Sequence, residues 1–163
     1  AISWLAREVT TSQEAALSAL RLSGGAPAAA LALLQPNVQT QREQLCQALG
    51  GVADSGDWLS LLPAINHDQA PDRLYWLAAL LLDALKIQQG ATLVSNVDAW
   101  SLVNSLAQLL PGVALRAILH AVCQCREQLL SVTGLNRELV LTDLLLTIEH
   151  YLQPGTTLPA SYL

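Results

Sequence analysis

The sequence predicts an all-α protein. Apolar residues recur three and four positions apart along most of the chain, which is the spacing of one helix face. Alternating runs rich in β-branched residues, the signature of strands, do not occur over any convincing length. Prolines and capping residues precede the apolar segments, and glycines follow them, as expected for helix starts and stops.

Composition narrows the class of protein further. Of the 163 residues, 52% are hydrophobic and only 13% are charged, so the chain has too much apolar surface to be disordered. Its densest apolar stretch, 76–87, contains Asp83 and Lys86 and falls far short of the roughly 20 apolar residues of a membrane span. The net charge of −5 has the wrong sign for a domain whose main task is to bind phosphates.

The start of the chain and its cysteines suggest where the protein works. Residue 1 is Ala, methionine is absent, and no basic-then-apolar leader is present, so we expect a cut or processed end. Three cysteines, an odd number without an extracellular spacing pattern, fit a reducing compartment better than a disulfide framework. We therefore expect a cytoplasmic protein.

Two short helices are predicted first. One covers residues 2–9. Thr11 caps the next, and Glu14, three residues later, gives the segment the form of a capping box, in which two side chains satisfy backbone donors of the first turn. The pair Gly24-Gly25 ends this helix, because glycine adopts the left-handed conformation of a helix end without a steric penalty.

A third short helix is predicted over residues 28–35. Pro27 suits its first turn, where the missing N–H does no harm, and Pro36 is expected to end it. The three helices carry mostly small side chains, too few for a strong core of their own. Residues 1–36 are therefore expected to form a small three-helix domain.

From about Val38 the predicted helices become longer. Gly50-Gly51 is expected to end the first of them, and Pro63 predicts a kink or a shortened helix in the second, which Asp57 caps. Gly90 closes the third, and Asn96 or Asp98 starts the fourth. Residues 37–163 are thus expected to form about six helices before an irregular tail from residue 156: 40–49, 58–65, 71–89, 96–110, 113–133 and 136–152.

The last two helices carry more apolar surface than one core-facing stripe needs. The helix over 113–133 has one polar stripe, made of Arg116, His120, Gln124, Gln128 and Ser131. The final helix has an apolar stripe of Val140, Leu144, Ile148 and Tyr151, and Leu139 and Leu146 lie on a different face. A helix that is apolar around most of its circumference is buried on several sides, either inside its own domain or against another chain. A central core position accounts for most of these leucines. The apolar residues beyond one core-facing stripe leave an interface with another chain as the alternative.

Motifs of enzyme chemistry are absent from the sequence. No phosphate-binding loop, nucleophile elbow, zinc-protease helix or paired-cysteine ligand set occurs. The group that comes nearest to a metal or thiol site is His120, Cys123 and Cys125. As an active site it would indicate a small metal- or thiol-dependent enzyme. Cys125 points away from the other two on a helix, so the three cannot converge on one ion, and two packed thiols beside a surface histidine are the more economical interpretation.

Asp83 and Lys86 form a charged pair three residues apart in an apolar helix. We expect a solvated edge with a weak ion pair, which stabilises a helix by about 0.2–0.5 kcal/mol. The alternative is a polar contact to a neighbouring subunit. Four scattered tryptophans do not make a base-stacking platform and are expected to be core or contact anchors.

Several runs of residues resemble one known family. Trp4–Val9, Ala19–Pro27 and Ala29–Leu33 resemble the helical lid of clamp-loader subunits, and Arg126–Leu146 with Ile148–Gly155 resembles their last collar helices. The similarity to subunits of bacterial DNA polymerase III covers essentially the whole chain. It implies an all-α chain with a lid at residues 1–36, the end of an ATPase module, and a collar or oligomerisation domain at residues 37–163.

The resemblance also implies a subunit that does not hydrolyse ATP. Family members carry an N-terminal ATPase domain, which this sequence lacks, and in hydrolysing relatives a glycine-serine-x-arginine pattern opens the third lid helix. The equivalent stretch here is Gly25-Ala26-Pro27-Ala28, with Ala28 at the position of the phosphate-sensing arginine. No catalytic residue, cofactor or metal is therefore expected, and the chain by itself is expected not to be an enzyme.

The implied task is assembly of a ring. The resemblance implies the delta and gamma/tau clamp-loader subunits as partners in a heteropentamer, with the beta clamp and primed DNA contacted only through the whole complex, and no membrane. The candidates for the subunit interface are Leu139, Leu146, Asp83 and Lys86. A free-standing all-α interaction adaptor remains the alternative.

Overall fold

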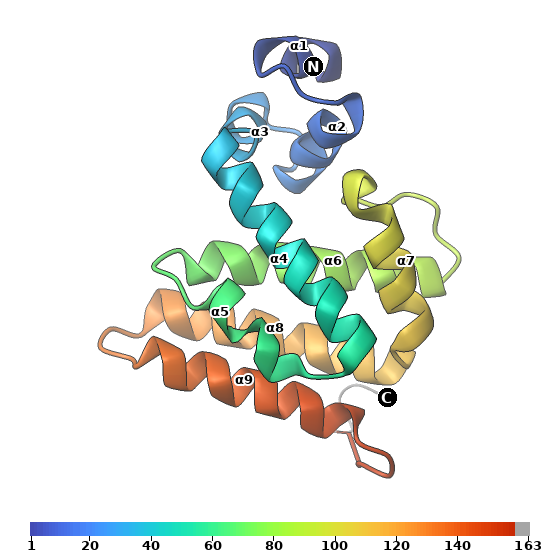
Figure 1. The fold of residues 1–163 in the computed structure, drawn as a ribbon, viewed down its shortest axis with the longest axis vertical. Coiled ribbons are helices and arrows are strands. Elements are labelled where there is room, and N and C mark those ends of the chain that lie inside the picture. Colours follow the sequence, from blue (N-terminus) through green and yellow to red (C-terminus); the bar gives the residue numbers. More distant parts are fainter. Residues whose placement is uncertain (159–163) are drawn as a thin grey trace.

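The structure is a computed structural model that describes residues 1–158, and every regular element in that range is helical, which confirms the all-α prediction (Figure 1). The five residues 159–163 of the expected irregular tail lie outside the described residues. The elements, in chain order, are α1 (Ile2–Glu8), α2 (Gln13–Leu22), α3 (Pro27–Leu33), α4 (Pro36–Ser55), the 3₁₀ turn η1 (Trp58–Leu61), α5 (Leu62–Ile65), α6 (Ala70–Gln88), the 3₁₀ turn η2 (Val97–Ala99), α7 (Trp100–Leu109), α8 (Gly112–Ser131) and α9 (Arg137–Leu152).

Two separate hydrophobic cores divide the chain. The first three helices enclose a small one, made of Leu5, Ala16, Ala19, Ala30 and Leu34. The helices from α4 onward enclose a much larger one around α6, which packs on α7 and α8. In Figure 1 the small group α1–α3 stands on top of the larger one, and α4 leads from one to the other.

The larger group is layered. Helix α8 packs against both α6 and α9, and α4 crosses in front of them, with α7 closing one side (Figure 1). Leucines of α6 that are fully buried form the centre of this core: Leu74, Leu77, Leu80 and Leu81. Their spacing of three and four residues is the helical period that the sequence shows.

The start of α2 differs by one residue from the prediction. Ser12, and not Thr11, is the cap, and its Oγ accepts a hydrogen bond from the Ala15 N–H at 3.1 Å. The Thr11 N–H, which a capping box would pair with the Glu14 side chain, bonds instead to the Ala6 carbonyl oxygen at 3.2 Å. The capping box at Thr11 and Glu14 is therefore wrong.

Helix α4 is the largest departure from the prediction. Pro36, which was expected to end α3, is also the first residue of α4. The helix does not end at Gly50-Gly51 but continues to Ser55, and Gly56 closes it in the left-handed conformation at φ 76°. Each glycine inside a helix costs about 1 kcal/mol relative to alanine. Burial of Leu45, Leu49 and Val52 on one face of α4 outweighs that cost, because burying one such side chain contributes roughly 1.5–3 kcal/mol.

Most other helix boundaries follow the sequence signals. The Asp57 carboxylate caps η1 by accepting the Ser60 N–H at 3.3 Å, and Pro63 lies in the first turn of the very short α5, as its position predicts. Gly90 follows α6 in the left-handed conformation. Asn96 does not cap a helix; its side chain turns inward, and η2 precedes α7.

No single helix within residues 1–158 is long and apolar enough to cross a bilayer. Two pairs of helices there reach the length and apolar composition of a span only when joined across bends of 119° and 120°.

Candidate subunit interface

Helix α9 has one face inside the core and one face outside. Leu144 and Ile148 of the predicted inner stripe are buried, and Val140 and Tyr151 are half-buried. Leu139 and Leu146 lie on the other face, 66% and 49% exposed. The two leucines that the sequence sets apart are therefore exposed, in contrast to the buried leucines of the same helix.

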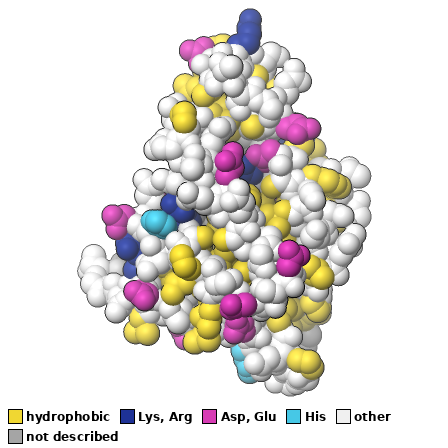
Figure 2. All heavy atoms as spheres, in the orientation of Figure 1, with side chains coloured by type: hydrophobic (Ala, Val, Ile, Leu, Met, Phe, Trp, Pro, Cys, Tyr) yellow, Lys and Arg dark blue, Asp and Glu magenta, His cyan; other side chains and the backbone are white. Residues whose placement is uncertain are grey.

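Further exposed apolar side chains lie next to this face in the chain. The turn between α8 and α9 and the last turn of α8 add three of them: Leu130, Val132 and Leu135. In Figure 2, hydrophobic side chains are spread along the lower edge of the molecule, where α9 lies. We call Leu130, Val132, Leu135, Leu139 and Leu146 the α9 outer face.

Acidic groups near this face have different roles. Asp143, between Leu139 and Leu146, is exposed. Glu149 instead holds the core together, because its Oε1 accepts the backbone N–H groups of Trp58 and Leu59 at 3.0 and 3.4 Å. These donors open η1 and have no partner within it, so Glu149 attaches α9 to η1.

Asp83 does not lie on a solvated edge, so that prediction is wrong. Its side chain is buried, and its two oxygens accept hydrogen bonds from the Ser95 N–H at 3.0 and 2.9 Å and from the Asn96 N–H and Nδ2 at 2.8 Å. Lys86 Nζ donates a further bond at 3.0 Å. Asp83 is buried because the chain that follows α6 folds back over its carboxylate.

The electrostatics of Asp83 follow from these contacts. Burial by itself would raise the pKa of this carboxyl group, since burial disfavours the charged form. The bonds from Ser95, Asn96 and Lys86 act in the opposite direction and hold the pKa below its usual value. Asp83 is therefore a charged anchor inside the chain, and only Lys86 of the pair, with 35% of its side chain exposed, can reach a neighbouring molecule.

We call residues 89–99, the segment that Asp83 binds, the junction loop. It connects α6 to α7 and bonds to the small domain, because Arg21 Nη1 donates to the Val94 carbonyl oxygen and the Asp98 N–H donates to Ser18 Oγ at 3.2 Å. Arg42 of α4 donates to both oxygens of Asp98 and to Asn96.

A separate bond joins the two groups of helices at α6. The Tyr75 hydroxyl donates to the Leu22 carbonyl oxygen at 2.6 Å, at the end of α2. The guanidinium of Arg126 covers the same ring at 5.6 Å. The small domain is thus attached to the larger one by polar contacts with α6 and with the junction loop, which Arg42 of α4 binds from the other side.

Ala28 is exposed in the first turn of α3. Its methyl group offers neither a charge nor a hydrogen-bond donor, so it cannot bind a phosphate as an arginine would. The structure places it on the surface of the small domain.

The three residues of the alternative enzyme site lie on α8. Cys123 is exposed and Cys125 is buried, so their side chains point to different sides of the helix. Partial desolvation of its sulfur, together with Glu127, raises the pKa of Cys123, and burial together with Asp143 raises the pKa of Cys125 to about 11, which keeps both thiols protonated and weakly nucleophilic. Among residues 1–158, no group of His, Cys, Asp and Glu side chains is arranged to hold a metal ion, His120 included.

A groove between α2, α4 and α7 was missed from the sequence. Its cavity of about 840 Å³ is lined by α2 and the end of α3, by Glu43, Gly50 and Asp54 of α4, and by Ser101 of α7, among others. The signals that could have located it are the acidic residues at positions 43 and 54, on either side of the glycine pair. They were missed because the glycines predict the end of the helix, and not its middle.

Comparison with known families assigns both parts of the chain. Residues 36–150 match the family described as DNA polymerase III, delta subunit, C terminal. The chain belongs to this family. Residues 1–35 match a second family, described as DNA polymerase III subunit delta', AAA+ ATPase lid domain. These matches confirm the resemblance noted from the sequence.

Individual relatives agree with this assignment. The chain is 61% identical to DNA polymerase III subunit delta' of Escherichia coli (strain K12), over all of this chain and 49% of the relative. It is 47% identical to the protein of the same name from Yersinia pestis, over 98% of this chain and 48% of the relative. The chain spans about half the length of the curated relatives it matches.

Proposed function

We propose that this chain is the lid and collar of a non-hydrolysing subunit of the bacterial DNA polymerase III clamp loader. Residues 1–36 are the lid and residues 37–163 the collar, which assembles a heteropentamer with delta and gamma/tau subunits. That complex loads the beta clamp onto primed DNA in the cytoplasm. The family matches, to the C-terminal domain of the delta subunit and to the delta' lid, support this proposal.

The observation that carries the proposal is the α9 outer face. The collar already has a large closed core, yet Leu139 and Leu146 stay exposed on one helix. Covering one such side chain completely would contribute roughly 1.5–3 kcal/mol to association. A subunit in a ring of different proteins needs such faces in addition to its own core.

The remaining features fit a structural role. Alanine at position 28 removes the arginine that would contact ATP, so the lid is proposed not to sense nucleotide. The net charge of −5 suits a part that leaves contact with DNA and the beta clamp to the whole complex. The DNA polymerase activity for which the relatives are named belongs, in this proposal, to the assembled holoenzyme.

The test is binding to purified delta and gamma subunits. We expect Leu139→Asp and Leu146→Asp each to weaken binding about tenfold or more, because a charge on a covered apolar contact is costly. Leu93→Asp is the matched control: Leu93 is 67% exposed but lies in the junction loop, away from α9. Circular dichroism checks that all three variants fold.

The outcomes separate the candidate functions. Undiminished binding by both α9 variants would remove that face from the interface. No binding of the wild-type chain to either the delta or the gamma subunit would favour a free-standing adaptor and contradict the proposal. Stoichiometric zinc in the purified protein would instead support the thiol- or metal-dependent enzyme with His120, Cys123 and Cys125.

A further inference from the structure

The cores of the lid and the collar have almost no side chain in common. Each domain has its own hydrophobic core, and among residues 1–158 only Leu33, at the end of α3, packs against both. Hydrophobic contact has no preferred direction, so one shared side chain does not define an angle between two domains. The angle therefore depends on the connecting chain and on the contacts at the junction loop.

The connection between the two domains is short enough to act as a hinge. Helices α3 and α4 are separated by two residues, Leu34 and Gln35. The backbone changes from helical at Leu34 to extended at Gln35. A change of φ and ψ at a few such residues between helices is enough to swing a domain. Contacts outside the hinge are therefore needed to hold the lid at one angle.

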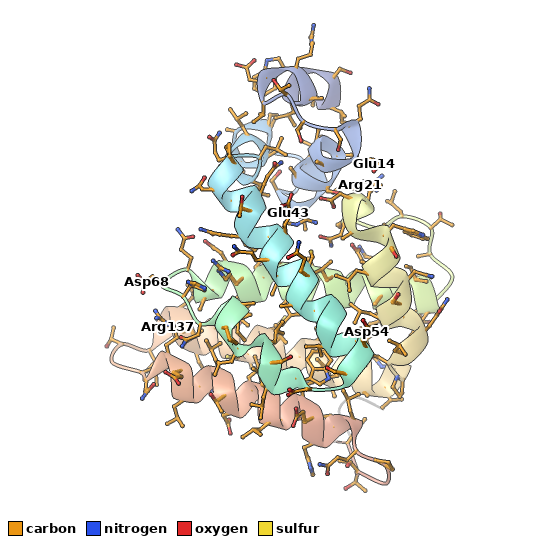
Figure 3. All side chains as sticks on the ribbon, viewed as in Figure 1. Glu14, Arg21, Glu43, Asp54, Asp68 and Arg137 are labelled. Atoms are coloured by element: carbon orange, nitrogen blue, oxygen red, sulfur yellow. The ribbon has the colours of Figure 1, made fainter. Side chains whose placement is uncertain are left out.

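Helix α2 of the lid meets the collar at the junction loop. The Asp98 N–H donates to Ser18 Oγ at 3.2 Å, and Arg21 donates to the Val94 carbonyl oxygen. Ser18 and Val94 are buried, so these bonds are largely shielded from water. Figure 3 shows Arg21 where α2 meets the segment that leads into α7. The junction loop is thus a seat against which α2 packs.

Arg42 of α4 holds this seat from the collar side. It donates to both carboxylate oxygens of Asp98, and its Nη2 also donates to Asn96 Oδ1 at 2.8 Å. A bidentate pair of arginine and carboxylate has a strict geometry, so it fixes position as well as adding stability. Asp98 is also the residue whose backbone bonds to Ser18, so Arg42 determines where α2 finds its hydrogen-bond donor.

Asn96 links Arg42 to the buried Asp83. Its side chain is fully buried, with Nδ2 donating to Asp83 Oδ2 at 2.8 Å and Oδ1 accepting the bond from Arg42. The donor end of the amide thus faces the carboxylate and the acceptor end faces the guanidinium. Turning the amide over would place like partial charges against both groups. The junction loop is therefore held in one position by two helices, α4 and α6.

We propose that Arg42 is a positioning residue for the lid. Through Asp98 and Asn96 it holds the junction loop as a seat for α2, and this seat fixes the angle of the lid at the hinge between α3 and α4. This role belongs to the chain alone and goes beyond the proposed assembly with other subunits. Without the seat, the lid keeps its own core and swings about residues 34 and 35.

The angle of the lid can be measured as a distance between two spin labels. One label is attached at Glu14→Cys, on the exposed surface of α2, and the other at the exposed Cys123 of α8, with Cys46→Ala and Cys125→Ala in every variant. Electron paramagnetic resonance of the full chain gives the distribution of distances. We expect Arg42→Met, which keeps the aliphatic stem and removes the donors, to broaden this distribution about twofold or more.

Arg137→Met is the matched control. Arg137 also bonds to an asparagine and an aspartate, Asn66 and Asp68, but both lie within the collar, between α5 and α6. Figure 3 shows Arg137 and Asp68 at one edge of the collar, away from the lid. This variant should leave the distance distribution as it is in the parent chain. Equal broadening by the two arginine variants would overturn the role of Arg42.

A second variant tests the same seat without changing Arg42. Asp98→Ala removes the carboxylate that Arg42 binds and keeps the backbone N–H that bonds to Ser18. It should broaden the distribution as Arg42→Met does. The double variant should broaden it no further than either single one, because the two side chains act as one unit. Circular dichroism checks that each variant folds, and Asp98→Ala decides the matter if only Arg42→Met does not.

Three results would overturn the proposal. The first is a folded Arg42→Met chain with the distance distribution of the parent chain. The second is a double variant that broadens the distribution further than either single one. The third is loss of the fold in both single variants, because the bonds would then hold the collar together and not the angle of the lid. None of these results bears on assembly with delta and gamma subunits, which the variants of α9 test separately.

Discussion

The junction between lid and collar and the outer face of α9 are opposite kinds of surface. At the junction, polar groups of the chain meet each other: Arg21 with Val94, Ser18 with Asp98, and Tyr75 with Leu22. On α9, the leucines at positions 139 and 146 are left largely in water. The contrast indicates that contacts closed within the chain control its stability, whereas the open face contributes little to it and is the face that we propose for association.

The largest expected effect is at the junction. Asp83→Ala removes the carboxylate that accepts hydrogen bonds from Ser95, Asn96 and Lys86, and it leaves the buried Asn96 donors without this partner. Breaking such a buried polar cluster costs about 3–5 kcal/mol of unfolding free energy. Urea denaturation of the variant and the wild-type chain measures it.

The control for this prediction is Asp72→Ala. Asp72 is exposed in the first turn of the same helix, α6, and its removal should cost no more than about 1 kcal/mol. Equal losses for the two variants would mean that Asp83 does not anchor the junction loop.

Two adjacent leucines of α9 test the other side of the comparison. Leu145 is fully buried, so Leu145→Ala should lower the unfolding free energy by about 2–5 kcal/mol. Leu146→Ala should change it by less than about 0.5 kcal/mol, because that side chain is largely in water already. A large stability loss for Leu146→Ala would show that its face is closed within the chain.

A smaller effect is expected where α6 meets the lid. Tyr75→Phe deletes only the hydroxyl that bonds to Leu22 and keeps the ring beneath Arg126. The lost bond should cost about 0.5–1.5 kcal/mol. Hydrogen exchange should then be faster in α2 and unchanged in α9, and faster exchange in both helices would contradict a local role.

The dependence of stability on pH gives the smallest effect. Because the folded chain holds the pKa of Asp83 below its ordinary 3.8, the charged carboxylate stabilises the fold above that pH. This contribution should be lost as the pH falls below 3.8 toward the lower pKa of the folded state. Asp83→Asn should flatten that part of the acid unfolding curve, and an unchanged slope would count against the bonded, charged state.

The sequence predicts the elements whose signals are local. Pro71 and Gly90 delimit α6 closely, and the two faces of α9 follow from periodicity, which is why Leu139 and Leu146 could be named. Signals that depend on distant packing were missed. Gly50 sits inside α4 because buried leucines hold that helix together, and no local pattern shows this.

The burial of Asp83 was missed for a related reason. Its spacing to Lys86 suggests an ion pair on a helix surface, and that bond does exist. The bonds that dominate come from Ser95 and Asn96, in a loop whose path is set by the lid and by Arg42. Likewise the groove arises only when α2, α4 and α7 are brought together.

Assembly with purified partners is the decisive measurement. The wild-type chain is mixed in equal amounts with purified delta and gamma subunits and passed through a size-exclusion column with light scattering. We expect one complex containing all three proteins, which Leu139→Asp together with Leu146→Asp breaks without unfolding the chain. Elution of the folded wild-type chain alone, at its own mass, would contradict the claim that its open apolar face serves association.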